Sequence, residues 1–235
     1  MGSMSYPANA ATPDQTLGQT LGETADWAAD AEARVLAEAL KRAPAQGWTW
    51  AMTKAAGAAA GFSLGETELL LPGGPRDLAT LYSRACDAAA MAALAQIDPK
   101  SLKVRERIRC GAMARTDAAM ASEAATRRWA GFLALPSNAA LGLRLVWESA
   151  DAIWNWAGDT ATDENHYSKR ALLAGILAAT LLVRLSQGES AAEATLDRRI
   201  EAVMAFERFK ARVGKLKLGE GAVGALGRLR YGLRV

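Results

Sequence analysis

The chain has 235 residues, of which 51% are hydrophobic and 23% are charged, and its formal net charge is +3. This length can bury one sizeable core, or one core and a smaller lobe, and abundant alanine with few aromatic residues predicts an all-α fold. Cys86 and Cys110 lack metal-ligand spacing, which excludes a cysteine zinc site and favours reduced thiols. No apolar run reaches the ~18 residues that span a bilayer, so we expect no transmembrane helix.

Residues 1–24 are expected to form a disordered arm. Met1–Met4 has the pattern of a cloning scar followed by a native start. The rest of the segment is polar, contains Pro and Gly, and shows no helical period. It has neither the apolar region of a secretory signal nor the cations of a transit peptide, so we expect a bacterial, cytoplasmic protein.

Residues 25–95 are expected to form an N-terminal lobe. Its helices are predicted over Asp26–Arg42, Thr49–Ala59, a short segment capped by Ser63, and Arg76–Ala95. This order is similar to the N-terminal part of TetR-type regulators, in which the second and third helices form a helix-turn-helix.

The predicted helix-turn-helix lacks the chemistry that DNA binding needs. Residues 55–75 contain no Lys or Arg, while Glu66 and Glu68 lie where the recognition helix would be. Because phosphates dominate the affinity of DNA-binding proteins, we expect a degenerate helix-turn-helix and no nucleic-acid partner.

Residues 96–213 are predicted to add five helices, giving a TetR-regulator-like bundle of about nine. The fifth helix is expected to start at Pro99, and the sixth to end before Pro136. The other three are expected over Leu141–Ala157, Glu164–Gln187 and Ala191–Val213. On Glu164–Gln187, one face is small and smooth, which suits a close intramolecular contact or a homodimer seam. The small residues are Ala171, Ala174, Gly175, Ala178 and Ala179. The opposite stripe, which faces a core or a ligand cavity, consists of Leu173, Ile176, Leu177, Leu181 and Leu185.

The segment Trp156–Arg170 concentrates polar residues at a junction between two helices. Gly158 is a natural C-cap of the preceding helix, and Thr162 or Asp163 is a natural N-cap of the next. Asp163 and His166 share a helix face, but the chain has one His, so we expect no metal, no cofactor and no catalytic residue here.

This junction, with the Leu135–Asn138 corner before it and a small-residue helix after it, resembles the signature of the COQ9 family of ubiquinone-biosynthesis accessory proteins. The resemblance implies that the junction is a patch that docks a partner, the di-iron quinone hydroxylase. Eukaryotic members have a Trp where this chain has His166. The residues of this expected docking patch are Asp159, Asp163, Asn165, His166, Tyr167, Lys169 and Arg170.

The resembled architecture also implies a homodimer through the last two helices and a pocket among the middle ones. Methionines are adaptable apolar side chains that suit a lipid pocket, although they are more often ordinary core. The predicted lining consists of Met91, Ile108, Met113, Met120, Trp129, Leu133, Leu145, Ile176 and Met204.

Residues 214–235 are predicted to be a basic, amphipathic tail. Apolar residues recur at helical spacing and are flanked by arginines, which fits a helix lying in a membrane interface, although a disordered basic tail fits equally. The candidate membrane residues are Lys215, Lys217, Val223, Leu226, Arg228, Leu229, Arg230 and Leu233. The basic cluster Lys100–Arg109 is either a solvated face or a second membrane site.

Two functions are open at this point. The first is a non-enzymatic accessory protein, peripheral on the bacterial inner membrane, that binds an isoprenoid quinone intermediate or a phospholipid and presents it to the hydroxylase. The second is a TetR-type regulator with a small-molecule effector. The acidic segment around Glu66 favours the first.

Overall fold

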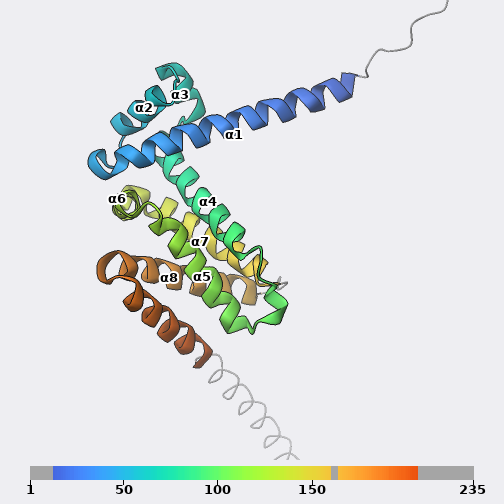
Figure 1. Cartoon of the computed structure of the whole chain (residues 1–235), viewed down its shortest axis with the longest axis vertical. Coiled ribbons are helices and arrows are strands. Elements are labelled where there is room, and N and C mark those ends of the chain that lie inside the picture. The colour runs from blue at the N-terminus through green and yellow to red at the C-terminus, as the bar shows by residue number, and fades with distance from the viewer. Residues whose placement is uncertain (1–12, 160–163, 206–235) are drawn as a thin grey trace, which may run out of the picture. The chain divides into compact units, whose positions relative to one another are not determined.

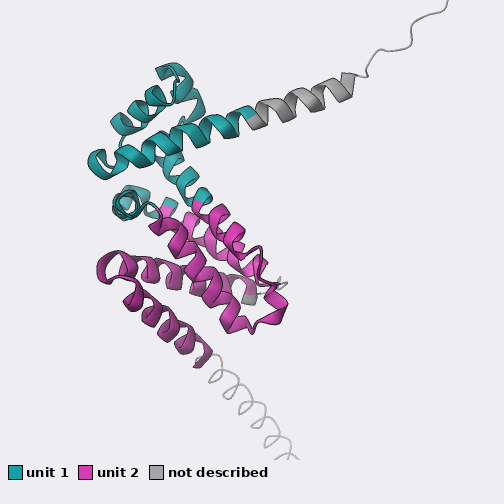
Figure 2. Ribbon diagram, viewed as in Figure 1, with its two compact units in different colours: residues 1–85, 122–141 teal, residues 86–121, 142–235 magenta. Residues whose placement is uncertain are grey.

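The computed structural model describes residues 13–159 and 164–205 (Figure 1), and side chains from Trp27 onward except those of 164 and 165. Every regular element in these ranges is a helix, which confirms the predicted all-α fold. The chain divides into two compact units (Figure 2). Among the described residues, those up to 85 and 122–141 form the first unit, and 86–121 and those from 142 onward form the second. This division differs from the expected boundary between residues 95 and 96.

The first unit contains α1 (Pro13–Gln46), α2 (Trp50–Ala59), α3 (Leu64–Leu70), the start of α4 (Pro75–Leu94), α6 (Glu123–Leu133) and the 3₁₀ turn η2 (Pro136–Asn138). α1 begins at Pro13 and not at Asp26, inside the segment that we expected to be disordered. Proline suits the first helical position, since its missing N–H would be unpaired there anyway.

α2 and α3 are the two short helices that the sequence predicts. They approach closely at Gly57, where an added Cβ would lie 2.1 Å from the Thr67 hydroxyl oxygen. Ser63 caps α3 with a capping box, as expected: its hydroxyl accepts from the Glu66 amide at 3.3 Å, and the Glu66 carboxylate accepts from the Ser63 amide at 2.7 Å.

One of the acidic residues of α3, Glu66, is part of this capping box. The hydrogen bond from the Ser63 hydroxyl, together with that from its amide, lowers the pKa of Glu66, so this carboxyl is ionised at neutral pH. Glu68 pairs with Lys54 of α2 at 3.2 Å. Lys54 is therefore already engaged, and Glu66 would repel a phosphate backbone.

Aromatic side chains hold the core of the first unit. The Tyr82 ring lies 5.6 Å from that of Trp48 and 5.7 Å from that of Trp129. The indole N–H of Trp48 donates to the Ala125 carbonyl at 3.2 Å, and that of Trp129 donates to the Ala79 carbonyl at 3.1 Å. These contacts tie α6 to α4, which explains why residues 122–141 belong to this unit.

The second unit contains the rest of α4, the 3₁₀ turn η1 (Pro99–Ser101), α5 (Val104–Met120), α7 (Ala139–Trp156) from residue 142, α8 (Glu164–Gln187) and the helical residues 189–205. The bounds of α8 confirm the prediction. The fifth helix, expected from Pro99, starts at Val104, because Asp98 caps only the short turn η1. Buried Leu173, Ile176 and Leu177 of α8 pack with Ile153 and Leu196, which confirms these core-facing positions.

The composition of α8 bears on the expectation that the chain has no transmembrane helix. Within the described residues, His166–Gln187 is long and apolar enough to cross a membrane, with a mean hydropathy of 1.4. A search for uninterrupted apolar runs misses it because polar side chains interrupt the sequence. A third of that stretch is buried inside the unit, and a helix that packs one side on a protein core has the same composition.

Candidate functional site

The junction between α7 and α8 begins at a left-handed glycine. Gly158 has a φ of +81°. Its N–H donates to the Asn155 carbonyl at 3.1 Å, and the Asp159 N–H donates to the Trp154 carbonyl at 3.0 Å. This pair of bonds is the Schellman pattern that ends many helices, and it confirms Gly158 as the C-cap. The predicted N-caps, Thr162 and Asp163, lie outside the described residues.

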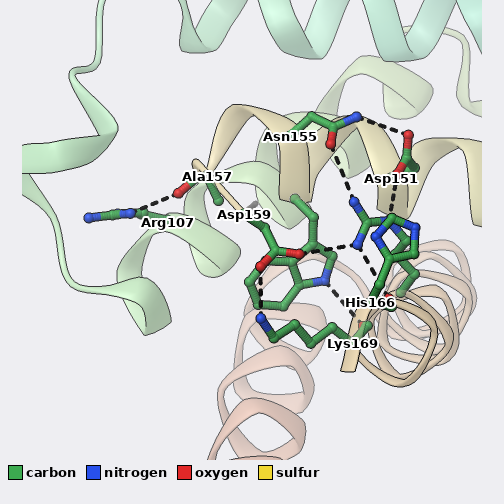
Figure 3. Close-up of polar contacts among 9 residues, drawn as sticks. Arg107, Asp151, Asn155, Ala157, Asp159, His166 and Lys169 are labelled. Carbon is green, nitrogen blue, oxygen red and sulfur yellow. Dashed lines mark hydrogen bonds and ion pairs between the residues drawn. The ribbon is translucent and has the colours of Figure 1, made fainter. Parts of the chain in front are cut away.

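A buried arginine ties the two helices together (Figure 3). The Arg170 side chain is 2% exposed, and its Nη1 donates to Asp159 Oδ2 at 3.1 Å. Its Nε pairs with Asp151 of α7, and its Nη2 donates to Asn155 Oδ1 at 3.3 Å. Asp159 is itself 7% exposed. Arg170 is therefore a buried, fully paired charge of the kind that fixes one arrangement of its neighbours.

Lys169 is held by the same aspartate. Its ammonium lies 2.7 Å from Asp159 Oδ1 and 5.4 Å from the centre of the Trp154 ring. The Trp154 indole N–H donates to the Lys169 carbonyl at 3.1 Å. The side chain is thus fixed through its backbone, its charge and a cation–π contact.

Tyr167 and His166 lie in the first turn of α8. Tyr167 is 65% exposed, and its ring is 6.2 Å from that of Trp147 and 5.2 Å from that of His166. Exposed tyrosine next to other rings is common in protein–protein interfaces, so these two residues can form a contact surface.

A pocket of about 460 Å³ lies in the second unit, within the usual size range of small-molecule sites. It lies among α5, the end of α7, the first half of α8 and the helical residues 189–205. Its walls are apolar except at Arg105, Ser168 and Lys169. The apolar lining consists of Val104, Ile108, Trp154, Leu172, Leu173, Ile176, Ile200, Val203 and Met204.

The predicted docking patch separates into three groups. His166 and Tyr167 are accessible, whereas Asp159 and Arg170 are buried in the ion-pair network. Lys169 lines the pocket. Asp163 lies outside the described residues, and nothing is described of the Asn165 side chain.

The predicted lipid pocket is only partly the one that the structure contains. Ile108, Ile176 and Met204 line it. Met91 and Met113 instead pack against the core, and Leu145 is buried outside the lining. Met120 is half-buried and also outside it, while Trp129 and Leu133 belong to the first unit. The predicted membrane residues, all within 214–235, are outside the described part.

Several lining residues, among them Lys169, Leu172 and Val203, were not predicted, although a signal was present. Lys169 and Leu172 follow the i, i+3, i+4, i+7 spacing of one helix face together with Leu173 and Ile176, and Val203 shares a face of the next helix with Ile200 and Met204. Within the described residues, no three His, Cys, Asp or Glu side chains gather as metal ligands would.

Comparison with known proteins bears on this same region. Residues 139–207 match the COQ9 family. The match covers α7, the junction, α8 and the described helical residues after it, and so includes every pocket-lining residue except Val104, Arg105 and Ile108. The resemblance recognised in the sequence is thereby confirmed for this segment.

Three curated relatives illustrate the extent of the similarity. The chain is 40% identical over 77 residues to the mitochondrial ubiquinone biosynthesis protein COQ9-A of Xenopus laevis. It is 41% identical over 75 residues to COQ9 of Rattus norvegicus and 37% identical over 75 residues to COQ9 of Homo sapiens, both mitochondrial. The aligned part is 31–32% of this chain and 24% of each relative. The similarity thus spans about a quarter of the length of these relatives.

Proposed function

We propose that this protein is a non-enzymatic, lipid-binding accessory protein of ubiquinone biosynthesis. It binds an isoprenoid quinone intermediate or another lipid and presents it to a di-iron hydroxylase. The observation that carries the proposal is the apolar pocket beside the α7–α8 junction, inside the segment that matches COQ9. An isoprenoid tail is insoluble in water, so a protein that shields it helps an enzyme to reach the head group.

The hydroxylase is proposed to dock on the surface formed by Tyr167, His166 and their neighbours. Tyr167 offers an exposed ring next to Trp147, and the pocket opens among residues of the same helix. Docking at this surface would bring the partner close to the bound lipid.

We propose that the protein acts as a homodimer at a bacterial inner membrane. Ala171, Gly175 and Ala178 of α8 are exposed, and nothing lies within 4 Å of a Cβ added at Gly175. Ala174, which was expected on the same face, is instead buried in the core of the second unit. This open, small face suits close approach of a second helix. The basic residues of 214–235 remain the proposed membrane contact, since each cation near an anionic leaflet adds about 1 kcal/mol.

Filling the pocket tests lipid binding. Val203 lines the pocket and is partly buried, so Val203→Trp should occupy its space and reduce bound lipid at least about tenfold, while the fold tolerates the larger side chain because the space is open. Native mass spectrometry of the purified protein measures the bound lipid. Leu143→Trp, at a 71% exposed site on α7, is the control and should keep it. Full lipid occupancy in Val203→Trp would contradict the proposal.

Removing the exposed ring tests docking. Tyr167→Ala should weaken association with the quinone hydroxylase about tenfold or more, because aromatic anchors carry much interface energy. It should change the free energy of unfolding by only about 0.5 kcal/mol, as is usual for surface positions. Pull-down and thermal unfolding measure the two effects. Leu182→Ala, also exposed but far along α8, should leave association unchanged, and an equal loss in both variants would argue against a docking role of Tyr167.

The regulator alternative receives no support from α3. A recognition helix needs cations, and Glu66 is instead an ionised cap while Lys54 is paired with Glu68.

A further inference from the structure

Lys169 is a pocket residue whose position is set by buried groups. Arg105, the other cation of the lining, pairs with Glu201 at 3.2 Å, and both of these side chains are about half exposed. Lys169 instead pairs with Asp159, which is nearly inaccessible, and its carbonyl is bound by the indole of Trp154. Such anchoring reduces the entropy that a side chain loses when it binds a ligand.

The charges around Lys169 are balanced. Asp159 faces the ammonium of Lys169 and the guanidinium of Arg170, and Asp151 pairs with Arg170 from α7. Two cations therefore meet two carboxylates. An ammonium carries three N–H donors, and the contact with Asp159 occupies one of them. These four side chains carry no net charge together, so their network can donate a hydrogen bond but attracts an anion only weakly.

The rest of the pocket specifies the orientation of a ligand. Leu173, Ile176 and Ile200 give an apolar wall away from Lys169 along α8 and the following helix. A molecule with one polar end would place that end at Lys169, because burying it against the apolar wall would leave it without a hydrogen bond.

We propose that Lys169 determines the specificity of the pocket by donating a hydrogen bond to an uncharged oxygen of the ligand's head group. This inference rests on the proposed function, since it requires that the pocket binds a lipid. It assigns Lys169 to ligand recognition and not to the docking patch.

Three probes with one tail separate the possibilities. Geranyl-1,4-benzoquinone carries uncharged oxygens, geranylbenzene has a six-membered carbon ring of similar size without oxygens, and geranyl diphosphate carries an anion. In native mass spectrometry titrations of the full chain, Lys169→Met should weaken binding of the quinone about tenfold, the usual effect of losing a hydrogen bond to a charged group. Binding of geranylbenzene should stay within about twofold, since it makes no such bond.

Two further variants serve as controls for Lys169→Met. Arg109→Met removes a cation of α5 that lies outside the pocket lining and should leave quinone binding unchanged, whereas Lys169→Arg keeps the ion pair with Asp159 and should retain most of it. Equal weakening of the quinone and geranylbenzene by Lys169→Met would show a merely structural Lys169 and overturn the inference, while lipid binding itself would stand. Tighter binding of the diphosphate than of the quinone, lost in Lys169→Met, would overturn the assignment of an uncharged head group. If no probe binds the unmodified protein, the proposed function fails with it.

Discussion

Replacing Arg170 by Met should lower the free energy of unfolding by about 3–5 kcal/mol, because it removes a buried charge that pairs with both Asp151 and the buried Asp159. Arg170 is 2% exposed and binds Asp151, Asp159 and Asn155 at once. Met fills a similar volume, so the loss reports the charge and its hydrogen bonds more than a cavity. Urea unfolding followed by circular dichroism measures the change.

A control variant at an exposed arginine and a double variant show whether the loss comes from the buried charge. Arg109→Met removes a pair with Asp197 at 2.9 Å in which both side chains are about 40% exposed, and such exposed pairs contribute about 0–1 kcal/mol. Adding Asp151→Asn to Arg170→Met removes the carboxylate whose ion pair was lost and should restore part of the lost stability. A loss below about 1 kcal/mol in Arg170→Met would mean that Asp151 and Asp159 are adequately solvated without it.

The local features of the junction were predictable, and its long-range contacts were not. Gly158 and Ser63 act within one helical turn, so sequence spacing alone identifies them as caps. The burial of Leu173 and Leu177 follows from helical periodicity. Arg170 was expected in an exposed patch, because its partner Asp151 lies 19 residues away on another helix. Only packing of α7 against α8 reveals that pair.

For the apolar residues of the pocket, too, sequence spacing did not predict the long-range contacts. Periodicity tells which face of a helix is buried but not which element it faces. Trp129 and Leu133 have the composition of a pocket wall, yet α6 folds back on α4 of the first unit. Lys169 lies on the pocket face of α8 by spacing, but a lysine at a polar junction is most simply interpreted as solvated. Its ion pair with a buried aspartate depends on the Schellman turn that places Asp159.

Trp129→Ala should therefore destabilise the first unit by about 3–5 kcal/mol, the usual cost of truncating a buried Trp, and leave the pocket unchanged. Trp129 is nearly inaccessible, contacts the ring of Tyr82 and donates to the Ala79 carbonyl. Thermal unfolding measures the destabilisation, and native mass spectrometry at a temperature where the variant is folded measures bound lipid.

Trp27 provides the matched control for this change. It is 57% exposed and touches Phe62 edge-on with ring centres 6.4 Å apart, so Trp27→Ala should cost no more than about 1.5 kcal/mol, the upper value for an aromatic pair. Loss of lipid from the folded Trp129→Ala variant would contradict this expectation and would support the original prediction that Trp129 lines the lipid pocket. Retention of lipid with a lowered melting temperature would mean that Trp129 stabilises the core between α4 and α6. A residue that contacts no ligand can affect binding only through the fold that it stabilises.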